Sequence, residues 1–271
     1  MVSLRAVRLV AWAMFRETVR DRVPLSIAAF CAVLLGVSYL ISQMTAGQDL
    51  KIIKDLGLSS LSVFGLLIAV FLGINLVAKE VERRSIYPVI AKPVTREEFL
   101  LGKYTGLALA LVANLAAMTA AFFAVLLFVD VATPAFAKSG WPAPATDPWL
   151  LAAIGLIVAE LLVVTAIALF FSTFSSPMLS ALLTLGLWVA GHFNADLRRF
   201  EAVVDVPALA WIARGMYYVL PNLAPFDIKA EVVHGVPVAW SHVGLTLAYA
   251  VTYITLALLA AVAVFRRRDF K

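Results

Sequence analysis

Long apolar runs separated by short charged segments dominate this chain. An α-helix rises 1.5 Å per residue, so about 20 apolar residues are needed to cross the roughly 30 Å of hydrocarbon in a bilayer. Five of six runs reach that length, and the one that opens just after Pro177 is shorter. The pattern predicts six membrane spans: Pro24–Gln43, Leu58–Ala78, Tyr104–Val129, Trp149–Phe171, Met178–Phe193 and Val243–Phe265.

Residues 2–22 have a different pattern, which predicts an amphipathic helix lying at the membrane interface. Apolar residues and one threonine recur at helical spacing on one face, and arginines share the opposite face. The apolar face holds Leu4, Val7, Ala11, Met14, Phe15 and Thr18, and the basic face holds Arg5, Arg16 and Arg20. The late start of the first apolar run, with no clear cleavage site of small residues, argues against a secretory signal.

The composition agrees with a membrane protein and excludes an ordinary soluble domain. Hydrophobic residues make up 63% of the chain and charged residues 14%, against about 25% charged in soluble domains. The single cysteine, Cys31, excludes a disulfide framework, and the three histidines are too scattered to suggest a metal site. The predicted fold class is an all-α polytopic membrane protein, with six transmembrane helices preceded by the interfacial helix.

The most charged window, residues 79–103, lies between the second and third spans. Its four acidic and six basic residues are too costly to place in hydrocarbon, so the segment must lie in water. Thr95 is followed three residues later by Glu98 and then by apolar residues, which matches a capping box at a helix start. A short capped helix here would offer a soluble partner a docking element. The alternative is a solvated loop with a chance helix start.

The distribution of basic residues predicts the orientation. Segments on the cytoplasmic side of a membrane are enriched in lysine and arginine. If the N-terminus is inside, 15 of the 22 lysines and arginines fall in inner segments and seven in outer ones. This predicts an even number of spans with both termini cytoplasmic, in the plasma (inner) membrane.

Three segments are then expected on the outer side: residues 44–57, 130–148 and 194–242. The last is long and mixes apolar with charged residues, and three prolines (Pro207, Pro221 and Pro225) divide it. It is predicted to form short outer helices that dip into the interface or cap a cavity. The alternative is a small folded cap with no direct role in transport.

Glu160 is the strongest single-residue signal within a predicted span. It lies about midway along Trp149–Phe171, where an ionised carboxylate is costly unless it is paired, protonated or in contact with water. It either lines a substrate path or makes an interhelical hydrogen bond, for which Asn114 and Thr119 are candidates. Asn114 itself favours helix–helix contact. Tyr249 and Tyr253 are one turn apart and are weaker pathway candidates, for which ordinary packing is the better interpretation.

The chain has no recognisable ATP site. Gly102-Lys103 resembles the end of a phosphate-binding loop, but Glu97 occupies the earlier glycine position and Tyr104 replaces the required Ser or Thr. Hydrolase and zinc motifs are not found either, so a membrane enzyme is the least supported function. The basic end FRRRDFK favours a cytoplasmic headgroup anchor over nucleic-acid binding.

Several features together resemble the membrane subunit of type-2 ABC exporters, six-span permeases. They are the amphipathic start, the six spans, the loop E-x-E-R-R…K-P-V-T-R-E-E-F-L-L-G-K, the segment Y-Y-V-L-P-N-L-A-P-F and the terminal F-R-R-R-D-F. The likeness covers essentially the whole chain. Its most specific parts are Glu80–Lys103 and Tyr217–Phe226.

The resemblance implies a coupling helix at approximately Thr95–Lys103 that seats in a groove of an ATPase subunit. The implied coupling residues are Glu80, Glu82, Arg83, Arg84, Thr95, Arg96, Glu97, Glu98, Phe99 and Lys103. The implied partners are an ABC ATPase chain that binds ATP and Mg, a second copy of this chain, the lipid bilayer and accessory periplasmic or extracellular proteins. No cofactor and no metal is expected in this chain, and ATP hydrolysis is expected in the partner.

Two functions are therefore compared: the permease subunit of an ATP-driven exporter, and an ion-coupled secondary transporter or channel that uses Glu160. The second is weakened because one clear intramembrane carboxylate is present and no inverted repeat is visible. The cargo cannot be inferred, because an apolar pathway and an apolar lipid face have the same pattern.

Overall fold

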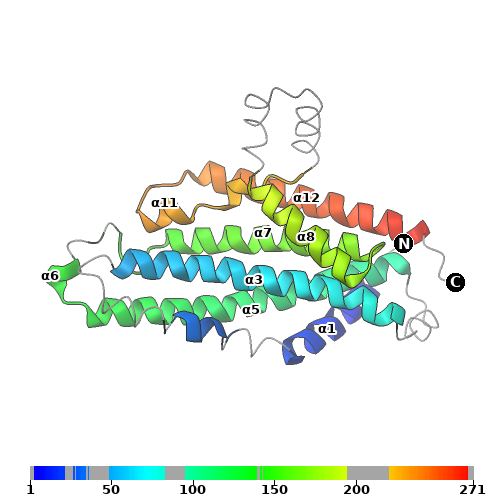
Figure 1. Ribbon diagram of the computed structural model, residues 1–271, viewed down its shortest axis with the longest axis horizontal. Helices are drawn as coiled ribbons and strands as arrows, with labels where there is room; N and C mark the ends of the chain where they lie inside the picture. Colours follow the sequence, from blue (N-terminus) through cyan, green and yellow to red (C-terminus); the bar gives the residue numbers. More distant parts are fainter. Residues whose placement is uncertain are drawn as a thin grey trace, which may run out of the picture.

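The computed structural model describes residues 3–21, 27, 29–34, 36, 49–82, 95–138, 141, 143–193 and 220–267. Over these residues the regular structure is helical, as predicted (Figure 1). The helices are α1 (Leu4–Asp21), α3 (Asp49–Glu82), α5 (Arg96–Ala132), α6 (Ala135–Lys138), α7 (Trp149–Ser172), α8 (Pro177–His192), the 3-10 turn η1 (Ala224–Phe226), α11 (Lys229–Val233) and α12 (Trp240–Arg267).

Among the described residues, four helices are long and apolar enough to cross a membrane: Leu50–Phe71 of α3, Glu97–Ala132 of α5, Trp149–Ser172 of α7 and Trp240–Arg266 of α12. They correspond to the second, third, fourth and sixth predicted spans. The predicted fifth span is α8, whose 16 residues are short for a crossing, as expected. The predicted first span, Pro24–Gln43, lies largely outside the described residues, so six spans remain a prediction.

Two predicted boundaries are wrong in the same way. Residues 44–57 were expected to be an outer segment, yet α3 is already helical from Asp49. Thr95–Lys103 was expected to be a separate short helix, yet it forms the first turns of the 37-residue α5. No proline follows to end either helix early, so the hydrogen-bond ladder runs on through the charged residues into the apolar run. At 1.5 Å per residue α5 is about 55 Å long, more than a bilayer core requires.

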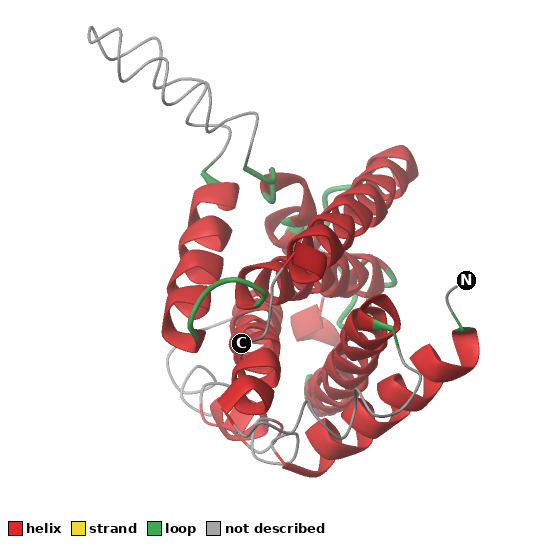
Figure 2. Cartoon of the chain, turned by 90° about the vertical axis from the view of Figure 1, so that its right-hand side faces the viewer, coloured by secondary structure: helices red, strands yellow, loops and turns green. Residues whose placement is uncertain are grey.

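The long helices lie side by side, with α7 in their midst (Figure 1). We call the end at which α5 begins the Thr95 end and the opposite end the Lys54 end. Figure 2 views the bundle from the Thr95 end, where α1 lies obliquely across the other helices. The segment predicted to lie on the outer side is described from residue 220, where η1 and α11 pack on α7 and α11 also contacts α3. Short helices are present in its described part, their place on the outer side stays a prediction, and residues 194–219 are outside the described range.

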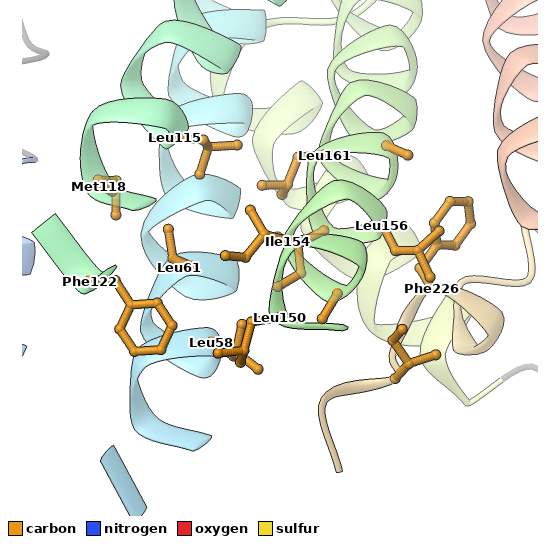
Figure 3. Close-up of a cluster of buried hydrophobic side chains, with 14 of the residues drawn as sticks. Leu58, Leu61, Leu115, Met118, Phe122, Leu150, Ile154, Leu156, Leu161 and Phe226 are labelled. Atoms are coloured by element: carbon orange, nitrogen blue, oxygen red, sulfur yellow. The ribbon is translucent and has the colours of Figure 1, made fainter. Parts of the chain in front are cut away.

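The core forms where α3, α5 and α7 meet (Figure 3). Leu161 of α7 is fully buried and packs over Gly65 of α3, where an added Cβ would lie 2.3 Å from Leu161 Cδ1. The other labelled side chains from the three helices are Leu58, Leu61, Leu115, Met118, Phe122, Leu150, Ile154 and Leu156. Close packing of this kind is the main source of helix–helix stability inside a membrane, where burial from water contributes little.

Truncating Leu161 should therefore be costly. Leu161→Ala leaves a cavity between α3 and α7, and we expect the free energy of unfolding to fall by about 2 kcal/mol or more. The apparent Tm of the purified chain in detergent measures this. Leu151→Ala on the same helix is the matched control, because Leu151 is 58% exposed and its truncation should change the Tm little. Equal Tm values for the two variants would contradict the described packing.

Candidate functional site

The first turn of α5 is held by the capping box that the sequence predicts. Thr95 is the N-cap, and its side-chain oxygen accepts the Glu98 N–H at 3.3 Å. In return, Glu98 Oε2 accepts the Thr95 N–H at 2.9 Å. These bonds satisfy two backbone donors that a helix start otherwise leaves without partners. The start of α5 is therefore fixed at one residue.

A second donor reaches Glu98 from α1. The backbone N–H of Ser3 donates to Glu98 Oε1, so one carboxylate joins the beginnings of two helices. Glu98 is buried by this contact. Lys103, one turn further on, is also buried, and its Nζ lies 4.4 Å from the centre of the Phe99 ring, a cation–π contact. Three predicted coupling residues thus belong to the packed junction of α1 and α5.

Two glycines of α5 allow α1 to approach its backbone. A Cβ at Gly106 would lie 2.6 Å from the backbone oxygen of Ala11, and one at Gly102 would lie 2.7 Å from Val10 Cβ. Gly102 and Gly106 form a G-x-x-x-G pair, the spacing that lets two helices pack closely in membranes. The sequence analysis tested Gly102 as part of a phosphate-binding loop and missed this role.

The predicted apolar face of α1 is confirmed in its middle and not at its start. Ala11 and Thr18 are buried and Met14 is half-buried against α5, whereas Leu4 is 83% exposed. Leu9 and Trp12 are also largely exposed. The helix thus presents one face to α5 and keeps further apolar side chains outside the bundle.

The end of α12 closes the same junction. Arg266 Nη2 forms an ion pair with Glu97 Oε1. Beneath this pair, Leu100 of α5, Leu169 of α7 and Phe265 of α12 form a separate apolar cluster with Ala261. The start of α5 is therefore bound to α1 on one side and to α7 and α12 on another. We call this set of contacts the Thr95 junction.

The remaining predicted coupling residues are only partly described. Glu80 and Glu82 lie in the last turns of α3 and Arg96 is the first residue of α5, but the structure does not describe their side chains. Arg83 and Arg84 lie outside the described residues. Five of the ten predicted residues lie together at the Thr95 junction: Thr95, Glu97, Glu98, Phe99 and Lys103. Whether any of them touches an ATPase stays a prediction.

Glu160 lies in α7 with 2% of its surface exposed. Its Oε1 accepts the indole N–H of Trp188 on α8 at 2.6 Å and lies 3.5 Å from His192 Nε2. An interhelical hydrogen bond was one of the two predicted roles, but the partner is on α8 rather than Asn114 or Thr119 on α5. Asn114 is itself buried within α5.

The ring of His192 is held beside Glu160 by contacts within its own helix. His192 Nδ1 lies 3.1 Å from the backbone oxygen of Trp188, and Nε2 faces the Glu160 carboxylate at 3.5 Å. The ring centres of His192 and Trp188 are 4.6 Å apart. Trp188, His192 and Glu160 together form what we call the Glu160 triad.

The tyrosines of α12 support the segment before that helix. The hydroxyl of Tyr249 accepts the Asn222 N–H at 2.9 Å, and the Tyr249 ring packs near Phe226 and Tyr253. Gly191 permits the same segment to approach α8, since a Cβ there would lie 2.8 Å from the Pro221 oxygen. These contacts favour packing over a pathway role for both tyrosines.

A cavity of about 510 Å³ opens at the Lys54 end beside the triad. It is lined by Asp55, Ser59, His192, Ala224, Asp227, Lys229, Ala230 and Glu231, which come from α3, α8, η1 and α11. Asp227 and Lys229 form an ion pair at 3.6 Å. Among the described residues, no three His, Cys, Asp or Glu side chains are placed to hold a metal ion.

A buried lysine fixes α3 at this end. Lys54 is 1% exposed, and its Nζ donates to the Pro144 oxygen at 2.6 Å. Asp147 is close enough to act on the Lys54 charge, and its carboxylate also accepts the Trp149 N–H at the start of α7. Sequence reasoning placed Lys54 in a polar outer segment and missed its burial, because nothing local distinguishes it from Lys51.

Residues 8–197, more than half of the chain, match the family described as ABC-2 family transporter protein. The chain belongs to the ABC-2 transporter family. This confirms the family that the sequence motifs resemble, and it identifies the chain as a membrane component of a transporter. A search of the curated proteins finds no match.

The α1–α5 contact of this ABC-2 chain should fail when Gly106 gains a side chain. Gly106→Ala must displace the Ala11 backbone, so we expect a lower apparent Tm and faster proteolysis of α1. Gly155→Ala is the matched control, because a Cβ there meets nothing within 4 Å. Alanine is the better helix former by about 1 kcal/mol, so the control should be neutral or stabilising. Equal Tm values and equal rates of α1 proteolysis in Gly106→Ala and Gly155→Ala would contradict the close approach of α1 to α5.

The Glu160–Trp188 bond can be tested with a double-mutant cycle. Trp188→Phe leaves a buried carboxylate without its donor, and we expect the free energy of unfolding to fall by about 1–3 kcal/mol. In a Glu160→Gln background the same change should cost less, because the two residues act as a pair. Trp12→Phe, at a position 62% exposed, is the control. Additive losses measured by chemical unfolding would show that the two side chains are not coupled.

Proposed function

We propose that this chain is the permease subunit of an ATP-driven exporter that works with a separate ABC ATPase chain. Family membership supports the transporter role. The proposed assembly has two permeases and two ATPases, in the plasma (inner) membrane with both termini cytoplasmic. The excess of lysine and arginine in the segments that this orientation places inside supports the orientation.

The observation that carries the coupling proposal is the Thr95 junction. The start of α5 is bound to α1 through Ser3 and Glu98 and to α12 through Glu97 and Arg266. A force applied to the first turn of α5 therefore reaches two other helices directly. Because α5 is one continuous helix of 37 residues, the same force is also transmitted along its length towards the Lys54 end.

In this proposal the ATPase binds at the Thr95 end, with the residues that precede and begin α5. Closure of the ATPases on ATP displaces the junction, and α5 with α12 carries that displacement across the membrane. Buried Glu98 and Lys103 hold the junction together, and exposed Thr95 meets the ATPase together with its charged neighbours in the sequence. The division of roles between these two groups is the part that a variant can test.

Arg96→Glu should uncouple the complex without unfolding the permease. We expect ATP hydrolysis by the purified permease–ATPase complex to fall about tenfold or more, because a reversed charge at an interface costs several kcal/mol. Lys51→Glu is the matched charge reversal at the Lys54 end and should leave hydrolysis unchanged. Unaltered hydrolysis and transport in Arg96→Glu, with normal complex formation, would contradict coupling at this position.

A second candidate function is supported by the Glu160 triad. A buried carboxylate in contact with an imidazole is suited to proton-coupled transport. A secondary transporter would move its substrate under an imposed proton gradient without ATP, and Glu160→Gln would abolish that movement. ATP-dependent transport by vesicles would favour the exporter, if the transport by Glu160→Gln is insensitive to the proton gradient. Family membership favours the exporter as well.

A further inference from the structure

The cavity at the Lys54 end has the size and the charge of a small-molecule site. Its volume of about 510 Å³ falls within the range of roughly 300–1,000 Å³ typical of ligand pockets. A single water molecule takes up only about 30 Å³ of liquid volume, so the cavity has room for an organic group rather than for one ion. Ala224 of η1 and Ala230 of α11 supply apolar surface beside the polar side chains.

The charges that line the cavity are predominantly negative. Three carboxylates (Asp55, Asp227 and Glu231) face one ammonium group, Lys229. Lys229 is paired with Asp227 at 3.6 Å, and neither Asp55 nor Glu231 has an ion-pair partner among the described residues. These two carboxylates come from different elements, α3 and α11, so they flank the cavity rather than follow one another along a helix.

The inner wall of the cavity adds the Glu160 triad. His192 lines the cavity and contacts Glu160 directly, and the charges of Asp227 and Lys229 are close enough to act on Glu160. The Glu160 carboxylate lies 3.5 Å from His192 Nε2, so a charge on that ring is paired with Glu160 rather than with Asp55 or Glu231. A partly enclosed cleft lined by one sign of charge focuses the electric field and concentrates ions of the opposite sign.

We propose that this cavity binds the protonated amine of an organic molecule. That this molecule is the one transported rests on the proposed export function. Asp55 and Glu231 hold the ammonium group, and Ser59 and His192 offer further hydrogen-bond partners. The organic part of the ligand fills the remaining volume against Ala224 and Ala230. The site lies at the end of the bundle away from the Thr95 junction, where the proposed orientation places the outer face.

Binding of dansylcadaverine to the purified full-length chain tests this directly. This probe has a primary amine and a fluorophore, and its N-acetylated form has the same shape without the charge. Fluorescence anisotropy should give saturable binding of the amine and binding of the acetylated form weaker by about tenfold or more, since a charge-assisted contact is lost. Equal binding of the two forms, or no saturable binding of the amine, would overturn the proposal.

Two variants locate the site. Asp55 and Glu231 are exposed, so Asp55→Asn with Glu231→Gln should fold normally, which an unchanged Tm verifies, and should weaken dansylcadaverine binding about tenfold or more. Glu17→Gln removes an exposed carboxylate from α1 and should bind as the unaltered chain does. Unchanged affinity in the double variant would overturn the site even if the probe binds elsewhere.

The measurement needs neither ATP nor the ATPase chain, so it is independent of the coupling experiment. Loss of binding in the double variant with an intact ATPase response separates the ligand site from the coupling site. A failure of Arg96→Glu to alter hydrolysis would leave the amine site standing, and absent amine binding would leave the coupling proposal standing.

Discussion

The burial of the middle of α7 is the constraint on which the other helices depend. Most residues around Glu160 are buried where α7 packs against α3, α5, α8 and α12, so a carboxylate there needs a partner supplied by a neighbouring helix. Trp188 supplies the donor, and His192 lies 3.5 Å away. These contacts fix the depth and rotation of α8, which is too short to be positioned by the membrane alone. The position of α8 in turn brings His192 to the cavity.

The two ends of the bundle use different means to join helices. At the Thr95 end, two glycines let α1 approach the α5 backbone, and carboxylates of the first α5 turn bind the start of α1 and the end of α12. At the Lys54 end, buried Lys54 binds the Pro144 oxygen, and residues of α3, α8, η1 and α11 line a polar cavity. Continuous helices connect the two ends, which gives an ABC-2 permease a direct mechanical path between its proposed ATPase contact and its proposed ligand site.

Sequence reasoning predicted what depends on local spacing and missed what depends on three-dimensional register. The Thr95–Glu98 capping box is encoded within four residues, and the apolar runs give the long helices directly. Glu160 was identified because a charge inside an apolar run is costly wherever it lies. The partners of Glu160 were not identified, because the rotation of α8 against α7 is set by packing over many residues. Gly102 and Gly106 did carry a recognisable signal in their four-residue spacing. Lys54 carried no recognisable signal in the sequence, since its burial follows from the fold of residues 143–148.

Co-purification tests the central claim most directly. The chain would be expressed with a candidate ABC ATPase chain, and the mass of the purified complex would be measured together with its ATP hydrolysis. The account predicts a stable complex with equal numbers of permease and ATPase chains, which hydrolyses ATP faster than the ATPase alone. A permease that purifies without the ATPase and leaves its hydrolysis unchanged would contradict the account. The Glu160 triad would then become the basis of the transport mechanism.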